Sequence, residues 1–86
     1  MSTISEADLL DNARNHAIKR IEIVQGKNRK YQLIVNLIWK EGDLVVVTTR
    51  KKPREWVNLN RLALHMIENY GVIPEINLTF YQPKDV

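Results

Sequence analysis

Residues 31–49 read YQLIVNLIWKEGDLVVVTT and decide the fold. From Tyr31 to Trp39, apolar or aromatic side chains occupy every second position, which is the period of a strand with one face in the core. Leu44–Thr49 is rich in β-branched residues and is typical of a second strand. Glu41–Gly42–Asp43 lies between the two and predicts a tight turn. We therefore expect an antiparallel hairpin, with Trp39 in the core or at its margin.

The chain before this hairpin predicts one helix and one more strand. Ser5 can cap a helix, and apolar residues recur at helical spacing from Leu10 to Ile21, which predicts a helix over residues 6–19. Residues 20–24 then alternate between polar and apolar side chains, as a half-buried strand does. The polar residues 25–30 predict a turn. The three strands therefore form an antiparallel meander.

The chain after the hairpin predicts a second helix and a last strand. Pro53 ends the third strand, and residues 54–57 leave room for an optional short fourth strand. The next apolar residues fall at helical spacing and form a stripe of Leu59, Leu62, Ala63, Met66, Ile67 and Tyr70. Gly71 is the expected stop of this helix. Residues 76–81 alternate as a strand, and residues 82–86 are expected to be a loose tail.

These elements predict a single α+β domain over residues 1–86. Their order is helix, three-stranded antiparallel meander, optional short fourth strand, helix and C-terminal strand. A chain of 86 residues has room for one domain. The second helix is expected to pack on the sheet face that carries Leu33, Val35 and Leu37.

Composition narrows the functional classes. The chain has no cysteine, which excludes disulfide bonds and thiolate chemistry. Its apolar runs are far shorter than the roughly 20 residues that span a bilayer. The first six residues are neither basic nor continuously apolar, so they do not resemble a signal peptide. These features predict a cytoplasmic protein without a membrane partner.

The sequence carries no signature of catalysis or of metal binding. His16 and His65 stand alone, without a second ligand at metal-binding spacing. The three glycines are scattered and cannot make a phosphate-binding loop. A nucleophile would need a positioned base, and no pattern indicates one. We therefore expect no enzymatic activity and no cofactor.

The formal net charge is +3, and the basic residues are unevenly distributed. Seven of the thirteen Lys and Arg residues fall in two segments: Lys27, Arg29 and Lys30 in the first turn, and Arg50, Lys51, Lys52 and Arg54 after the third strand. A meander places both segments at one end of the sheet, with Glu41 and Asp43 at the other end. The pattern predicts a basic edge that suits a nucleic-acid backbone or an acidic protein surface.

Trp56 adjoins the second basic segment and has two interpretations. It either packs beneath the start of the second helix, or it is exposed as a stacking or interface anchor beside the positive charges. In the second case Trp56 belongs to the same site as the seven basic residues.

Residues 47–63, VTTRKKPREWVNLNRLA, resemble small partition-associated or accessory proteins of plasmids and integrated mobile elements. In those proteins the strand end TTR is followed by a basic residue or glycine, then by proline or valine and Arg-Glu-aromatic, and then by a helix that begins with leucine. The resemblance implies an accessory role and no particular mechanism. A three-stranded sheet followed by a helix is also similar to the sheet-based DNA readers of some integrases and plant transcription factors, although a shared fold does not fix function.

Two hypotheses of different classes follow. The first is a non-enzymatic mobile-element accessory protein that binds nucleic acid through the basic edge, with Trp56 beside it. The second is a protein-interaction module, an inhibitor or adaptor, that binds through the last strand, an open sheet edge and Trp56, or forms a homodimer through paired edges. Exposed basic residues converging around Trp56 would favour the first hypothesis. An exposed apolar or unpaired edge would favour the second.

Overall fold

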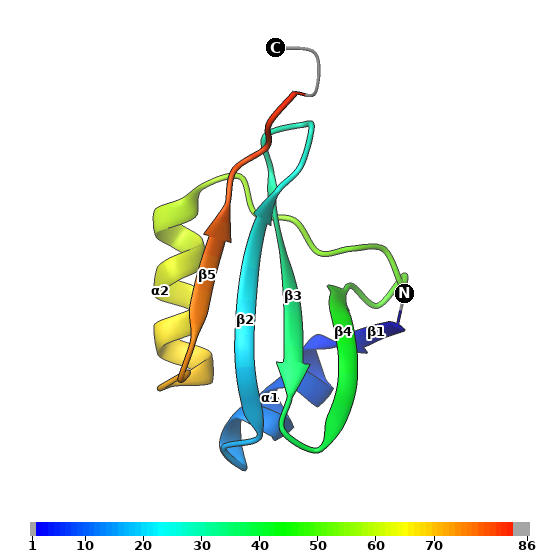
Figure 1. Ribbon diagram of the computed structural model, residues 1–86, viewed down its shortest axis with the longest axis vertical. Coiled ribbons are helices and arrows are strands. Elements are labelled where there is room, and N and C mark those ends of the chain that lie inside the picture. The colour runs from blue at the N-terminus through cyan, green and yellow to red at the C-terminus, as the bar shows by residue number, and fades with distance from the viewer. Residues whose placement is uncertain (1, 84–86) are drawn as a thin grey trace.

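The predicted meander forms the middle of a larger sheet in the computed structural model, which describes residues 2–83. Seven elements follow one another along the chain: β1 (Ser2–Ser5), α1 (Glu6–Arg14), β2 (Ile18–Gln25), β3 (Tyr31–Leu37), β4 (Lys40–Val47), α2 (Leu59–Tyr70) and β5 (Ile76–Thr79). The strands lie side by side in the order β1-β4-β3-β2-β5 (Figure 1). The α+β class is confirmed, but the sheet is five-stranded and mixed.

The two outer strands of the sheet are parallel to their neighbours. β1 pairs with β4, and β5 pairs with β2. The sequence pattern predicts no strand at β1, because this segment is four residues long and buries only Ile4. Its partner Val46 lies far along the chain, so no local pattern reveals the pairing. α1 connects β1 to β2, and α2 follows β4 and precedes β5, so each parallel pair is separated along the chain by two other strands and a helix.

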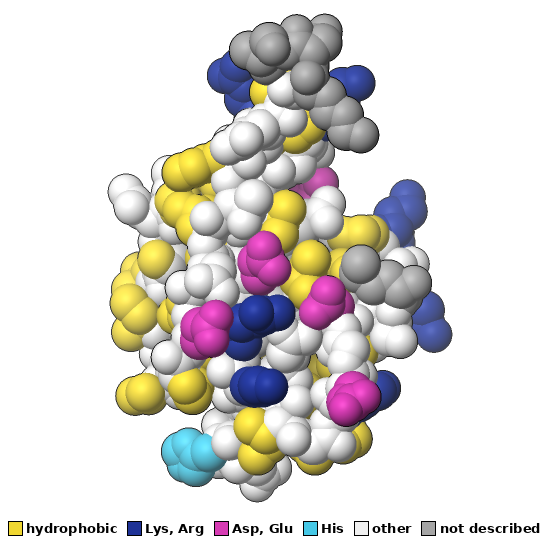
Figure 2. Space-filling view, in the orientation of Figure 1, with side chains coloured by type: hydrophobic (Ala, Val, Ile, Leu, Met, Phe, Trp, Pro, Cys, Tyr) yellow, Lys and Arg dark blue, Asp and Glu magenta, His cyan; other side chains and the backbone are white. Residues whose placement is uncertain are grey.

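Both helices cover the same face of the sheet, and the core lies between them and that face (Figure 1). The central strands contribute Ile18, Ile21, Ile23, Leu33, Val35, Leu37, Leu44 and Val46, and the other elements add Ile4, Leu9, Leu62, Met66 and Tyr70. The opposite face of the sheet has no helix over it among residues 2–83. Figure 2 looks onto this open face, where charged, polar and apolar side chains are mixed. No helix within this part of the chain is long and apolar enough to cross a membrane.

The first helix is shorter than predicted. It is capped by Ser5, whose hydroxyl accepts a hydrogen bond from the N–H of Asp8 at 3.1 Å, but it ends at Arg14 rather than at residue 19. His16 has a left-handed backbone with φ of 54°, which turns the chain into β2. Ile18 and Ile21 are therefore buried as strand residues. Their apolar positions fit the helical period as well, which is why the pattern extends the helix too far.

The β3–β4 turn lies three residues earlier than predicted. Leu37 pairs with Lys40, so Ile38 and Trp39 form the turn. The predicted turn at residues 41–43 is instead an irregularity within β4, where the register shifts between Val35 and Leu37. Gly42 has φ of 97°, a conformation that glycine adopts readily, and it marks this bulge.

The predicted core position of Trp39 is wrong. Because this residue lies in the turn and not on the face of β3, its side chain is 65% exposed. Its indole Nε1–H donates a hydrogen bond to Oδ1 of Asn12 at 2.8 Å, which fixes the ring against α1. The alternation from Tyr31 ends at Leu37, the last buried residue of the strand.

Only part of the predicted stripe on α2 is buried. Leu62, Met66 and Tyr70 lie in the core and Leu59 is partly buried, as expected. Ala63 and Ile67 are exposed, Ile67 by 70%. These two residues lie beside the outer strand β5, beyond which residues 2–83 provide no further strand to cover them.

The remaining differences concern segments outside the regular sheet. Residues 54–57 form no fourth strand; Trp56 makes an isolated bridge to Tyr31, and Pro53 makes another to Val47. β5 ends at Thr79, two residues earlier than predicted. Residues 82 and 83 of the predicted loose tail have no regular structure, and residues 84–86 lie outside the described residues.

Candidate functional site

The first basic segment forms the tip of the β2–β3 hairpin. The N–H of Gly26 donates to the carbonyl of Lys30 at 2.8 Å, and the N–H of Arg29 donates to the carbonyl of Gly26 at 2.9 Å. The side chain of Asn28 accepts from the N–H of Lys30 at 3.0 Å and stabilises the turn. Lys27, Arg29 and Lys30 are all exposed, so the tip presents three cations to solvent.

The second basic segment is a tight loop after β4. The N–H of Lys51 donates to the carbonyl of Thr48, and the N–H of Thr48 donates to the carbonyl of Lys52, both at 2.8 Å. Lys51 has φ of 63°, so the loop reverses sharply at this residue. The side chains of Arg50, Lys51 and Lys52 are exposed. None of these three residues, nor Lys27, Arg29 or Lys30, forms an ion pair within residues 2–83.

The two basic segments lie at the same end of the meander but do not form one continuous edge. The β2–β3 hairpin extends beyond the end of β4, and the loop after β4 lies lower, on the flank of the sheet (Figure 1). Figure 2 shows Lys and Arg side chains at the top of the molecule, along its right-hand side and in the middle of the open face, with other side chains between these groups.

A carboxylate lies beside the hairpin tip. Oε2 of Glu55 accepts hydrogen bonds from Asn28 at 3.0 Å and from Gln32 at 3.4 Å. These hydrogen bonds, aided by the charge of Lys30, hold the pKa of Glu55 below its usual value. The side chain is therefore negatively charged at neutral pH, and it offsets part of the positive potential at the tip.

Arg54 differs from the other six predicted basic residues, because it is held by contacts within the fold. Its Nη1 lies 2.6 Å from Oε1 of Glu6, and its guanidinium group lies 5.0 Å from the ring centroid of Trp56. Trp56 is only partly exposed and packs against the core. Its backbone exchanges hydrogen bonds with Tyr31 at 2.8 and 2.9 Å. Trp56 thus packs within the fold, as the first of its two interpretations expects, but its ring lies beside His65 in the middle of α2 rather than at the start of that helix.

Glu6, Arg54, Trp56, His65 and Tyr70 form a polar cluster between α1, α2 and the segment that joins β4 to α2. Glu6 also accepts a hydrogen bond from the hydroxyl of Tyr70, and its carboxylate lies 3.4 Å from Nε2 of His65. The ring of His65 lies 5.8 Å from that of Trp56 and 5.5 Å from that of Tyr70, measured between centroids. Burial, the hydrogen bond to Glu6 and the charge of Glu6 raise the pKa of Tyr70, so its hydroxyl remains a donor.

The sequence gives no local signal for this polar cluster. Glu6 and Tyr70 are separated by almost the whole chain, and His65 shares no spacing pattern with either of them. Hydrogen bonds join Glu6 to Arg54 and Tyr70, and Tyr70 to His65, and they fasten the N-terminal segment to α2.

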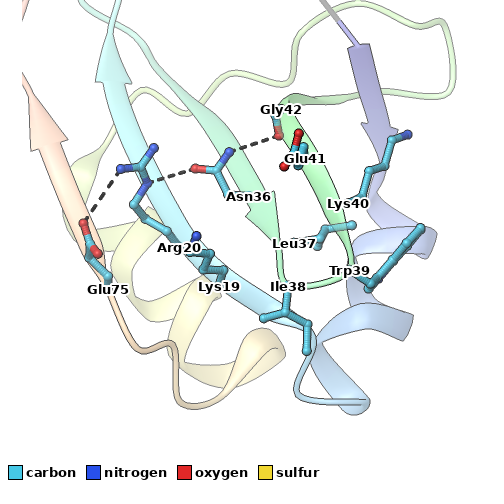
Figure 3. Close-up of a pocket in the computed structure, with 10 residues that line it drawn as sticks. All are labelled: Lys19, Arg20, Asn36, Leu37, Ile38, Trp39, Lys40, Glu41, Gly42 and Glu75. Atoms are coloured by element: carbon cyan, nitrogen blue, oxygen red, sulfur yellow. Dashed lines mark hydrogen bonds and ion pairs between the residues drawn. The ribbon is translucent and has the colours of Figure 1, made fainter.

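A groove of about 500 Å³ lies at the opposite end of the sheet, around the β3–β4 turn (Figure 3). Its floor carries a chain of polar contacts: Arg20 reaches Glu75 at 3.9 Å and donates to Asn36 at 2.9 Å, and Asn36 donates to the carbonyl of Gly42 at 3.1 Å. Lys19 and Lys40 also line the groove. The acidic end predicted from Glu41 and Asp43 is thus mixed in charge.

β5 is an open edge of the sheet. The carbonyl of Glu75 accepts a hydrogen bond from the N–H of Ile21 at 3.0 Å, and Ile76 is in register with Ile21. Alternate residues of a parallel edge strand direct their N–H and C=O groups toward the neighbouring strand, and the residues between direct theirs outward. The backbone groups of Ile76 and Leu78 therefore face away from β2, where residues 2–83 place no further strand.

The same edge carries exposed apolar side chains. Ile76 is 51% exposed and Leu78 is 41% exposed, and Phe80 just after the strand is 53% exposed. A groove of about 160 Å³ separates β5 from the C-terminal half of α2, and its lining includes Ile23, Ala63, Met66, Ile67 and Ile76. Two of these, Ile23 and Met66, belong to the core. The core therefore reaches the surface along this edge.

No protein-family model, curated protein or solved structure matches this chain. Among residues 2–83 there is also no group of three or more His, Asp or Glu side chains arranged to hold a metal ion. The candidate sites are therefore judged on their geometry and chemistry alone.

Proposed function

We propose that this protein is an interaction module that binds an extended protein segment along β5. The observation that supports the proposal is the coincidence of two features at one edge. The outward backbone groups belong to Ile76 and Leu78, and the same two residues expose apolar side chains. An added strand would satisfy the backbone groups and cover the side chains together.

The composition of β5 supports this reading. Natural sheet edges are usually protected from pairing by lysine, proline or a bulge. Residues 76–81 read INLTFY and contain no charge, no proline and no glycine. An uncharged segment of this kind pairs readily with other strands. The segment it accepts is expected to be uncharged as well, with apolar side chains at every second position that fit beside Ile67 and Ile76.

The contacts made by the predicted nucleic-acid-binding residues make nucleic-acid binding the second choice of function. Arg54 is paired with Glu6, Trp56 is packed against the core, and Glu55 lies beside the hairpin tip. The cations that remain are therefore in two separate groups, one at the tip of the β2–β3 hairpin and one in the loop after β4.

A peptide selection tests the interaction module. Random peptides displayed on phage would be selected against the immobilised protein, and the enriched peptides would be titrated into ¹⁵N-labelled protein. We expect amide shifts concentrated on β5 and on the exposed side of α2. Leu78→Lys should abolish binding, whereas Ile38→Lys, at an exposed position in the distant β3–β4 turn, should not. Shifts elsewhere, or binding that survives Leu78→Lys, would contradict the proposal.

Nucleic-acid binding remains the second candidate, and one observation favours it. Lys27, Arg29, Lys30, Arg50, Lys51 and Lys52 are exposed and form no ion pairs within residues 2–83. Unpaired cations of this kind can displace counterions from a phosphate backbone. Binding would then be weak, salt-dependent and without marked sequence preference. Either function is compatible with an accessory role in a mobile element, which the resemblance of residues 47–63 suggests.

A further inference from the structure

We infer that the extended segment bound by β5 is β5 of a second copy of this chain, so that the protein is a homodimer with one continuous ten-stranded sheet. This inference rests on the proposed function and names the partner. The two β5 strands would run antiparallel about a two-fold axis perpendicular to the sheet. Such an axis places the helices of both copies on the same side of the joined sheet.

The outward backbone groups determine the register. In an antiparallel pair, the residues that exchange two hydrogen bonds are those whose N–H and C=O groups both point toward the partner strand. On β5 these residues are Ile76 and Leu78. With the two-fold axis at Leu78, this residue exchanges both bonds with Leu78 of the second copy. Ile76 of each copy then lies opposite Phe80 of the other, and Asn77 lies opposite Thr79.

This register matches side chains on both faces. The side chains of Ile76 and Leu78 point to the helix side, as do those of their register partners Ile21 and Ile23. Apolar residues of the two copies therefore meet on the helix side, and Asn77 meets Thr79 on the open side. The exposed Ala63 and Ile67 of each copy lie beside the paired β5 strands, and dimer formation would bury them from solvent.

The absence of charged side chains favours self-pairing at this edge. Residues 76–83 contain no charged side chain, so the antiparallel arrangement brings no like charges together. Glu75 is the nearest charged residue before β5, and in this register it lies opposite Tyr81 of the second copy. Like charges that face each other across a strand pair would oppose pairing, and here there are none.

The other edge of the sheet is a poorer partner. β1 is four residues long and presents mostly serine and threonine. Pairing of β5 with β1 of another copy would leave one free edge on each molecule, so the contact would continue into a fibre. Pairing of β5 with itself uses the same surface on both copies and closes as a dimer.

The oligomeric state in solution tests the inference. Sedimentation velocity of the full chain across a concentration series should show a dimer. Leu78→Lys places two lysines opposite each other at the axis, and we expect it to raise the dimer dissociation constant by about 100-fold or more. Thr3→Lys is the matched control, because it puts the same charge on the other edge strand and should leave the dimer intact. A wild-type chain that stays monomeric up to about 1 mM, or equal dissociation by both variants, would overturn the inference.

A cysteine variant tests the register independently of the lysine variants. The chain contains no cysteine, so a single introduced thiol can react only with its own copy in another molecule. Hydrogen-bonded antiparallel partners have Cα atoms about 5.5 Å apart, within the range that a disulfide spans. Leu78→Cys should oxidise rapidly to a covalent dimer, whereas Val57→Cys, which is exposed elsewhere, should not. Equal rates for the two variants would exclude the register.

The peptide-binding and oligomeric-state experiments distinguish failure of the self-pairing inference from failure of the proposed function. If the wild type is monomeric but binds selected peptides at β5, only the self-pairing inference fails. If it is monomeric and no peptide binds at β5, both proposals fail.

Discussion

The carboxylate of Glu6, in the first turn of α1, accepts a hydrogen bond from the hydroxyl of Tyr70, the last residue of α2. Arg54 approaches the same carboxylate from the segment between β4 and α2. Glu6 thus joins three parts of the chain, each of which is connected to a different strand. Because β1 directly precedes Glu6 and is only four residues long, we infer that this contact helps to hold β1 against β4.

Stability should depend on pH through Tyr70. Its pKa is raised in the folded protein, chiefly by burial, whereas an unfolded chain has a tyrosine pKa of about 10. The stabilisation from the neutral hydroxyl is therefore complete below about pH 10 and is lost as the pH rises above that value. In urea unfolding, Tyr70→Phe should cost about 1–3 kcal/mol near neutral pH, with a smaller difference from wild type at higher pH.

The matching control is Tyr31→Phe, since no side-chain hydrogen bond joins Tyr31 to a carboxylate within residues 2–83. The difference between Tyr31→Phe and wild type should not shrink as the pH rises. A cost for Tyr70→Phe that is independent of pH up to pH 11 would argue against a protonated Tyr70 that donates to Glu6.

Substitutions in the buried part and in the exposed part of the predicted α2 stripe should change the free energy of unfolding by very different amounts. Leu62 is fully buried, so Leu62→Ala should lower the free energy of unfolding by about 2–5 kcal/mol. Ile67 belongs to the same predicted stripe but is 70% exposed, so Ile67→Ala should change it by less than about 0.5 kcal/mol in dilute solution. Chemical denaturation at low protein concentration measures both values. Equal costs would mean that Ile67 is covered within the monomer.

Local patterns predicted the centre of the fold well and its edges poorly. The alternation in β3 and the helical stripe of α2 reflect burial against near neighbours, so both elements are found where the sequence placed them. β1 and the position of β5 depend on parallel pairing with distant strands, for which an isolated four-residue segment carries no signal. Ala63 and Ile67 satisfied the stripe but lie beside an edge that nothing covers within residues 2–83.

The prediction of the basic site was incomplete for a similar reason, because some of its contacts depend on distant parts of the chain. Topology correctly placed both basic segments at one end of the meander, because strand direction alone decides that outcome. It could not show that Arg54 turns toward Glu6, since their ion pair depends on how α1 packs. The open apolar edge was identified only as an alternative, because the sequence does not reveal which strand is outermost.

The two tryptophans should be distinguishable by fluorescence. Trp39 is exposed in the β3–β4 turn, and Trp56 is packed against the core beneath Arg54. In the Trp56→Phe variant, the remaining Trp39 should emit at longer wavelength and be quenched strongly by acrylamide. In Trp39→Phe, the remaining Trp56 should emit at shorter wavelength and be quenched less. Acrylamide is preferred to iodide because it is uncharged and is not attracted by Arg54. Similar quenching constants would contradict these positions.

The last prediction separates the basic residues that can contact nucleic acid from the one held within the fold. If the second candidate function holds, affinity for random duplex DNA should fall with salt, with a log–log slope of about −0.9 per phosphate contacted. Replacing Arg50, Lys51 and Lys52 with Gln should flatten this slope and leave the melting temperature unchanged or raised, because three exposed like charges are removed. Arg54→Gln should do the reverse: the slope should stay close to that of wild type, while the melting temperature falls because Glu6 loses its ion-pair partner. Fluorescence anisotropy over a salt series and thermal unfolding measure the two effects. Absence of salt-dependent binding by the wild type at low ionic strength would remove the nucleic-acid function, and a flattened slope in Arg54→Gln would show that this residue faces the ligand instead of Glu6.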